Sequence, residues 1–146
     1  MKFMLLVYND PTLLDAMPVG EFNGEIQYCL GHADELRRGG RLLDSQMLQR
    51  PVTAKSVRSR NGKLTVRDGP FAEAKEVLGG FNLIEAEDMD EAVRIASEFP
   101  WTRTGCVEVR PVQDIEVVRR RVSTRTEAGP ERPTVPAPKD AVVLFD

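Results

Sequence analysis

Few side chains in this 146-residue chain combine the type and the position that acid–base chemistry requires. His32 is the single histidine, and an imidazole suits proton transfer near neutral pH. Asp68 precedes a Gly-Pro pair, where a turn would present its carboxylate to a cleft. We therefore predict that Asp68 is the catalytic acid or base and that His32 or Tyr28 assists it. The structural alternative is that Asp68 bonds its own backbone in an Asx-turn, while His32 is a half-exposed helix residue.

The charged segment that follows Asp68 supplies the other candidate contacts to a ligand. Glu73, Lys75 and Glu76 lie close together there. We predict that these three side chains and Tyr28 bind a small polar or aromatic molecule in a cleft between this segment and the first helix. The alternative is that the three charges are solvated or paired with neighbouring charges.

The two cysteines indicate no metal site and no disulfide. Cys29 and Cys106 are far apart in the sequence, so we expect two free thiols. Cys29 falls within an apolar helical stripe, which favours burial as a small apolar group over a nucleophilic role. One histidine and two distant cysteines match no strong metal-ligand spacing. We predict no metal and no other cofactor.

Hydrophobic periodicity predicts the elements that position these side chains. Between residues 2 and 8, both the odd-numbered and the even-numbered positions hold apolar side chains, which is typical of a strand covered on both faces. Apolar residues at steps of three and four predict a helix over 19–38. A capping box that begins at Asp88 predicts a second helix over 89–98. Residues 12–18 are expected to form a loop or a short turn.

The remaining strands complete an α+β pattern. Strands are predicted over residues 41–48, 79–86 and 105–112, and Gly79-Gly80 indicates a bulge or a close backbone approach. Asn61-Gly62 predicts a type I′ turn in a hairpin over residues 54–67.

The resulting order, β-α-β-hairpin-β-α-β, is typical of a ferredoxin-like split βαβ fold with helices on one face of an antiparallel sheet. The other face must also be covered, so we expect a homodimer through the open sheet face.

The charge and aromatic content of the chain indicate which classes of partner, such as nucleic acids and membranes, are not expected. A net charge of −3 and 6% aromatic residues give no basic excess, so no nucleic-acid partner is predicted. No apolar run approaches the length of a membrane span, and the features of a signal peptide are missing, so no membrane partner and a cytoplasmic location are expected. Residues 1–112 are predicted to form the domain. Residues 113–146 are predicted to form an extended Pro-rich tail with a short helix near 114–121 and an apolar end at 141–145.

The sequence DGPFAEAKE at residues 68–76, followed by LGGF at 78–81, resembles the hallmark of the DGPF-domain branch of the YCII-related family. Ala74 stands where that hallmark usually has threonine. The opening strand, the end of the first helix and the last strand also look like that branch. The resemblance covers residues 1–112.

The resemblance implies a ferredoxin-like fold of the dimeric α/β-barrel type. Some members are thought to use a His–Asp pair in a cleft, and at least one is a dehydrochlorinase of a chlorinated hydroxyaromatic. This implies lyase-like acid–base chemistry, such as an elimination. Here the family's histidine aligns with Cys29 rather than with His32. That departure favours the alternative function, a non-catalytic homodimeric sensor or protein-interaction module in a pathway linked to a sigma factor.

Overall fold

The computed structural model describes residues 1–123 of the chain, which divides into two compact units. The first unit contains residues 1–50 and 74–112, and the second contains residues 51–73 and 113–123 of the described chain. The first unit holds most of the regular structure. The second holds the inserted hairpin and the helix that follows the last strand.

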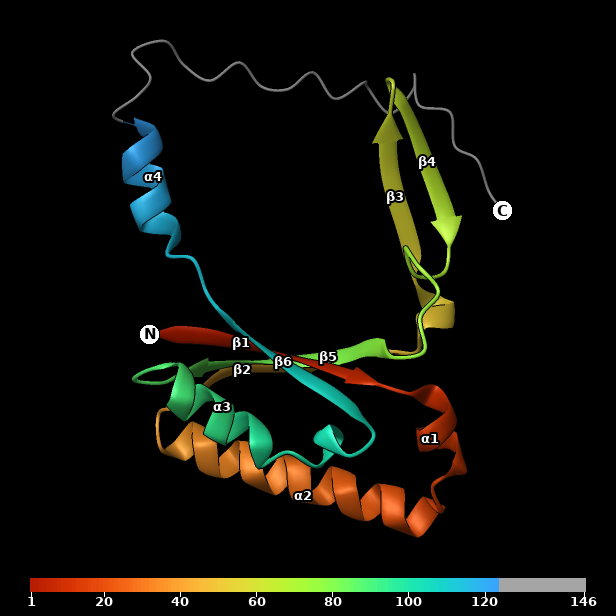
Figure 1. Ribbon diagram of the computed structural model, residues 1–146, viewed down its shortest axis with the longest axis vertical. Helices are drawn as coiled ribbons and strands as arrows, with labels where there is room; N and C mark the ends of the chain where they lie inside the picture. The colour runs from red at the N-terminus through yellow and green to blue at the C-terminus, as the bar shows by residue number, and fades with distance from the viewer. Residues whose placement is uncertain (124–146) are drawn as a thin grey trace. The chain divides into compact units, whose positions relative to one another are not determined.

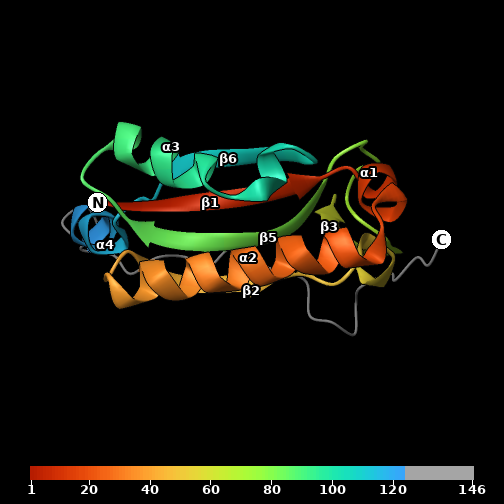
Figure 2. The ribbon, with the colours of Figure 1, turned by 90° about the horizontal axis from the view of Figure 1, so that it is seen from below.

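The first unit is built on a four-stranded antiparallel sheet with the order β2-β5-β1-β6 (Figure 1). Its strands are β1 (Lys2–Asn9), β2 (Leu42–Met47), β5 (Val77–Glu85) and β6 (Gly105–Pro111). Two helices, α2 (Val19–Arg38) and α3 (Met89–Ser97), cover the same face of this sheet (Figure 1). Figure 2 shows α2 running along β2, and α3 contacts β6. The predicted α+β class with an antiparallel sheet is confirmed.

The alternation of side chains along β1 explains its central place. Phe3, Leu5 and Val7 are buried on the face that the helices cover. Met4, Leu6 and Tyr8 point to the opposite face and are half-buried. A strand with apolar side chains on both faces avoids the edge of a sheet, and β1 lies between β5 and β6.

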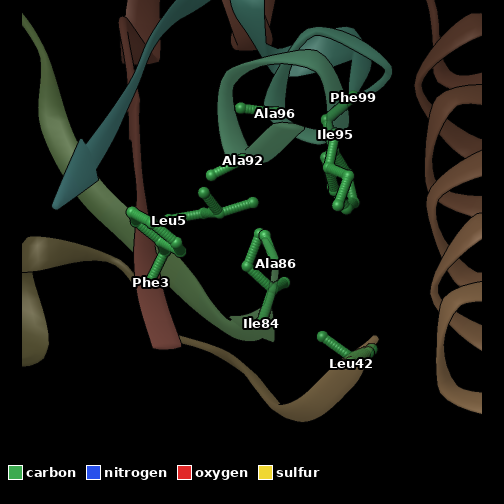
Figure 3. Packing of buried hydrophobic residues seen from close by; sticks show 9 residues of the cluster. All are labelled: Phe3, Leu5, Leu42, Ile84, Ala86, Ala92, Ile95, Ala96 and Phe99. Carbon is green, nitrogen blue, oxygen red and sulfur yellow. The ribbon is translucent and has the colours of Figure 1, made fainter. Parts of the chain in front are cut away.

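Nine buried apolar residues form one core between the sheet and the helices (Figure 3). Phe3, Leu5 and Ile84 extend from the sheet, and Ile95 from α3 packs against them. The remaining members are Leu42, Ala86, Ala92, Ala96 and Phe99. No residue of α2 is fully buried, so this helix contributes partly buried side chains such as Cys29, Ala33 and Leu36.

The residues that cap the helices agree with the predictions from the sequence, except at the start of the chain. The Asp88 carboxylate accepts a hydrogen bond from the Glu91 amide at 2.8 Å, as the predicted capping box requires. The Glu91 carboxylate contacts the Arg41 guanidinium. The expected loop over residues 12–18 is wrong in its first part, because α1 (Pro11–Ala16) forms there. Asp10 caps that helix and Pro11 occupies its first turn, a pair of signals that favours helix initiation.

Gly79 and Gly80 confirm the predicted bulge and close approach. Val7 pairs with Gly80 and Tyr8 with Leu78, so Gly79 is the extra residue of a bulge in β5. A Cβ atom on Gly80 would lie only 2.7 Å from the Gln46 carbonyl oxygen of β2. The two glycines therefore serve different purposes in neighbouring positions.

The second unit contains a separate two-stranded sheet formed by β3 (Lys55–Arg60) and β4 (Lys63–Asp68). Asn61 and Gly62 join these strands with φ angles of 52° and 77°, which confirms the predicted type I′ turn. A 3₁₀ turn, η1 (Pro51–Thr53), precedes the hairpin.

One prediction for the chain after the last strand can be compared with the structure. Helix α4 (Ile115–Ser123) confirms the short helix expected near residues 114–121. The rest of the predicted tail, with its apolar end at 141–145, lies outside the described residues. Between residues 1 and 123, no helix is long and apolar enough to cross a membrane.

Candidate functional site

A groove of about 580 Å³ opens between α2 and the stretch that runs from the end of α3 into the 3₁₀ turn η2 (Pro100–Thr102). We call it the helical groove. Its lining comprises Glu21, Gly24, Glu25 and Tyr28 of α2, and Ser97, Glu98, Phe99, Pro100, Thr102 and Arg103 of the opposite side. The lining combines the aromatic rings of Tyr28 and Phe99 with hydroxyl and charged side chains, and small-molecule sites use both kinds of group.

His32 lies directly behind the aromatic wall of the helical groove. Its ring stacks on Tyr28 with centroids 6.0 Å apart, and Phe99 meets it edge-on at 5.1 Å. Tyr28 and His32 are four residues apart, so they lie on the same side of α2. The structure therefore brings together two of the predicted site residues.

The close partner of His32 is Glu98, a residue that the sequence did not indicate. His32 Nε2 lies 2.9 Å from Glu98 Oε2, and the His32 side chain is only 12% exposed. The two atoms are within hydrogen-bonding distance but poorly aligned. Such contacts in catalytic sites often become aligned only when a ligand binds. The other carboxylate oxygen of Glu98 accepts a hydrogen bond from Arg94 at 2.9 Å.

An ion pair connects the two sides of the helical groove. Arg103 Nη2 lies 2.9 and 3.2 Å from the two carboxylate oxygens of Glu25. Glu25 is largely buried, whereas the arginine is largely exposed. Glu21 adds a third carboxylate to the lining, so Arg103 is the single cation among the groove residues.

Cys29 of α2 holds a neutral thiol. Burial, helped by the nearby Glu25 carboxylate and partly opposed by a hydrogen bond from the Trp101 side chain, raises the pKa of this thiol to about 11. A thiol with this pKa is almost entirely protonated at neutral pH and is a poor nucleophile. Cys106 is free and exposed.

The predicted catalytic residue Asp68 ends β4, in the second unit, whereas His32 and Tyr28 belong to the first. Its carboxylate pairs with Lys55 Nζ at 2.5 Å, and both side chains are more than half exposed. The turn after it is fixed through Gly69, which has a φ of 95° and donates its amide to the Ala54 carbonyl. Ser56 also donates a hydrogen bond to the Gly69 carbonyl.

The other predicted binding residues divide between the units. Glu73 belongs to the second unit and is exposed. Lys75 and Glu76 are exposed in the first unit, where Lys75 Nζ lies 4.0 Å from the buried Asp10 carboxylate. Throughout residues 1–123, no group of three or more His, Cys, Asp or Glu side chains is arranged to hold a metal ion.

The sequence matches the family model of the YCII-related domain over residues 1–116. The chain belongs to the YCII-related family. A relative, the uncharacterised protein R00369 of Rhizobium meliloti, is 32% identical over 114 residues, which are 77% of this chain and 92% of the relative. A solved structure, the 5-chloro-2-hydroxyhydroquinone dehydrochlorinase TftG of Burkholderia phenoliruptrix with 2,5-dihydroxybenzoquinone, is 16% identical with a TM-score of 0.41. That comparison covers 77% of this chain and 94% of the other.

The part of the helical groove that sequence reasoning missed is the side formed by Glu98 and Arg103. Glu98 follows α3 and is 66 positions from His32 in the numbering, and no local pattern links the two. Only the packing of α3 and η2 against the sheet brings them to α2. The Arg94–Glu98 spacing of four predicts a helical ion pair, but not its histidine neighbour.

Proposed function

We propose that this YCII-related protein binds a small polar or aromatic molecule in the helical groove. The observation that supports this most is the contact between His32 and Glu98, next to a groove that Glu98 and Tyr28 both line. Tyr28 is 55% exposed and offers a ring face on which an aromatic ligand can stack. Hydroxyl groups of Ser97 and Thr102 supply hydrogen bonds for polar substituents.

The arrangement suits a proton transfer in which Glu98 touches the ligand and His32 positions Glu98. Glu98 lines the groove, whereas His32 Nε2 is buried. In a lyase-like elimination, the Glu98 carboxylate would take a proton from a ligand carbon. The electron pair of that C–H bond would form the double bond as the leaving group departs with its own pair.

A ligand screen tests the proposal on the full chain. We expect hydroxyaromatics and small organic acids to raise the melting temperature of the wild type, because a ligand at 100 times its Kd stabilises by about 2.7 kcal/mol. Tyr28→Ala and Glu98→Gln should weaken any such shift, and Glu35→Gln, an exposed change on the same helix, should leave it intact. A ligand whose shift survives both groove variants would bind elsewhere and contradict the proposal.

The segment from Asp68 to Glu76 is a second hypothesis for the ligand. Asp68 is proposed as its acid or base, and Glu73, Lys75 and Glu76 as its binding residues. Support comes from the exposed Asp68–Lys55 pair, which a ligand can reach. A ligand shift that Asp68→Asn abolishes and Glu98→Gln does not would favour this segment over the helical groove.

A non-catalytic homodimeric sensor or interaction module is the alternative function. One face of the sheet has α2 and α3, and apolar side chains on the other, among them Leu6, Phe81 and Leu83, are half-buried in one copy of the chain. We infer a homodimer through that face. Light scattering should give a dimer mass for the wild type and for Leu30→Lys, a control on the exposed side of α2. Leu6→Lys should give a monomer, and a wild-type monomer would refute the inference.

We also infer that the chain belongs to the DGPF-domain branch of the family and that its fold is ferredoxin-like. The DGPFAEAKE sequence at residues 68–76 supports the DGPF-domain branch. The strand order β2-β5-β1-β6, with two helices on one face, supports the ferredoxin-like arrangement of the dimeric α/β-barrel type.

A further inference from the structure

The β3–β4 hairpin separates its side chains into two chemically different faces. Residues that pair across an antiparallel ladder share a face, and the faces alternate along the strands. The pairs Ser56–Arg67, Arg58–Thr65 and Arg60–Lys63 therefore lie on one side of the hairpin. The pairs Lys55–Asp68, Val57–Val66 and Ser59–Leu64 lie on the other.

The first of these sides, which we call the cationic face, has four basic side chains and no acidic one. The single carboxylate of the two strands, Asp68, is on the opposite side and is paired with Lys55. Arg58, Arg60 and Lys63 are exposed and surround the turn end of the hairpin. Their charges are therefore directed to solvent without a neutralising carboxylate on the same face.

The charge of residues 51–73 contrasts with the charge of the first unit. Residues 51–73 contain five Lys and Arg against two Asp and Glu. Residues 1–50 and 74–112 contain nine Lys and Arg against fifteen Asp and Glu. The expectation of no nucleic-acid partner rested on the 6% aromatic content and on the net charge of −3, and that total is the sum of a basic hairpin segment and an acidic first unit.

The composition of the cationic face indicates the kind of partner. Interfaces with folded proteins have apolar and aromatic anchors at their centre, and membrane-surface segments insert apolar side chains. The cationic face has neither, because its other members are Ser56 and Thr65. Arginine, lysine and hydroxyl side chains together are the groups that contact phosphates and sugars in nucleic-acid complexes.

We propose that the cationic face of the β3–β4 hairpin binds the phosphate backbone of duplex DNA without sequence specificity. The shape of the hairpin agrees with this, since each six-residue strand spans about 20 Å and a two-stranded ribbon fits the major groove of B-DNA. The deep, narrow major groove of A-form RNA excludes such a ribbon, so duplex DNA is preferred over duplex RNA.

Fluorescence anisotropy with a labelled 20-base-pair duplex tests the proposal on the full chain. We expect a Kd within about 1–100 μM at physiological salt, the range of non-specific binding, and tighter binding at 50 mM KCl. If Arg58, Arg60 and Lys63 each neutralise a phosphate, the slope of log K against log salt is about −2.7, and raising KCl from 50 to 200 mM weakens binding about 40-fold. The triple variant Arg58→Gln, Arg60→Gln, Lys63→Gln should lose most of its affinity and this salt dependence.

A matched control separates the face from total charge. The variant Lys2→Gln, Arg37→Gln, Arg38→Gln removes three exposed cations from the acidic unit and should bind DNA as the wild type does. Equal melting temperatures for both variants exclude a folding defect. The proposal is overturned if the wild type fails to bind DNA at 50 mM KCl, or if the two variants lose affinity equally. Stronger binding to phosphatidylglycerol vesicles, to poly-glutamate or to duplex RNA than to DNA would also overturn it.

Discussion

Adding one methyl group to each of two adjacent glycines should change stability in opposite directions. A Cβ atom on Gly80 would lie 2.7 Å from the Gln46 carbonyl oxygen and 3.4 Å from the Met47 Cα atom, both in the backbone of β2. A backbone oxygen cannot rotate away, so Gly80→Ala must push β2 from β5. Such overpacking costs about 1–3 kcal/mol.

The same methyl group on Gly79 meets no such obstacle. Its nearest neighbours would be Asn9 Nδ2 at 3.5 Å and the Val7 carbonyl oxygen at 3.9 Å, which are ordinary contacts. Gly79→Ala also reduces the entropy of the unfolded chain, so it should stabilise by about 0.4–1 kcal/mol.

Urea unfolding followed by circular dichroism measures the difference between the two variants. With the m-value unchanged, the midpoint should rise for Gly79→Ala and fall for Gly80→Ala, with a separation of about 1.5–4 kcal/mol. The close-approach explanation fails if Gly80→Ala is as stable as the wild type. It also fails if the two variants are destabilised equally, since that would indicate a general requirement for glycine at the bulge.

Three further outcomes follow from individual contacts. Because burial raises the pKa of Cys29 to about 11, the folded state favours the neutral thiol. The contribution of Cys29 to the free energy of unfolding is complete below the unfolded pKa of about 9, and it is lost as the pH rises toward 11. Stability should therefore fall less steeply over that range in Cys29→Ala than in the wild type, as urea titrations at several pH values will show. Ile95→Ala should cost about 2–5 kcal/mol because this side chain is fully buried, whereas Val93→Ala, half-exposed on the same helix, should cost far less in thermal melts. Asp88→Ala should cost about 1 kcal/mol through loss of the α3 cap, with the exposed neighbouring change Glu87→Ala as the control in the same assay.

Local sequence signals predicted the elements well, because each is decided by neighbours along the chain. The apolar stripe of α2, the Asn61-Gly62 turn and the Asp88 cap all act over a few residues, and the structure confirms each of them. The helix α1 was not predicted because Asn9-Asp10-Pro11, at its start, is also a turn signal. The same residues also make a helix start, in which Asp10 is the cap.

The candidate site was predicted only in part, because its two sides come from distant parts of the chain. Tyr28 and His32 share one side of a helix, so their proximity follows from spacing alone. Glu98 reaches His32 only through the packing of α3 and η2, which no local pattern encodes. The cationic face was not predicted either, because the pairing of two strands decides which of its residues lie together. Its residues alternate in sequence with Val57, Ser59, Leu64 and Val66, which belong to the other face, and their common orientation follows from the register of β3 with β4.

The position of β1 has a consequence for synthesis of the chain on the ribosome. Phe3 pairs with Ile84 on one side and with Pro111 on the other, so the first strand has no partner until much of the domain has been made. At about 5–20 residues per second, the interval between emergence of the strand and of its last partner is several seconds or more. During that time an apolar segment is available to chaperones and to neighbouring nascent chains. Truncation before β6 would leave one edge of β1 permanently unpaired, and such a fragment should aggregate.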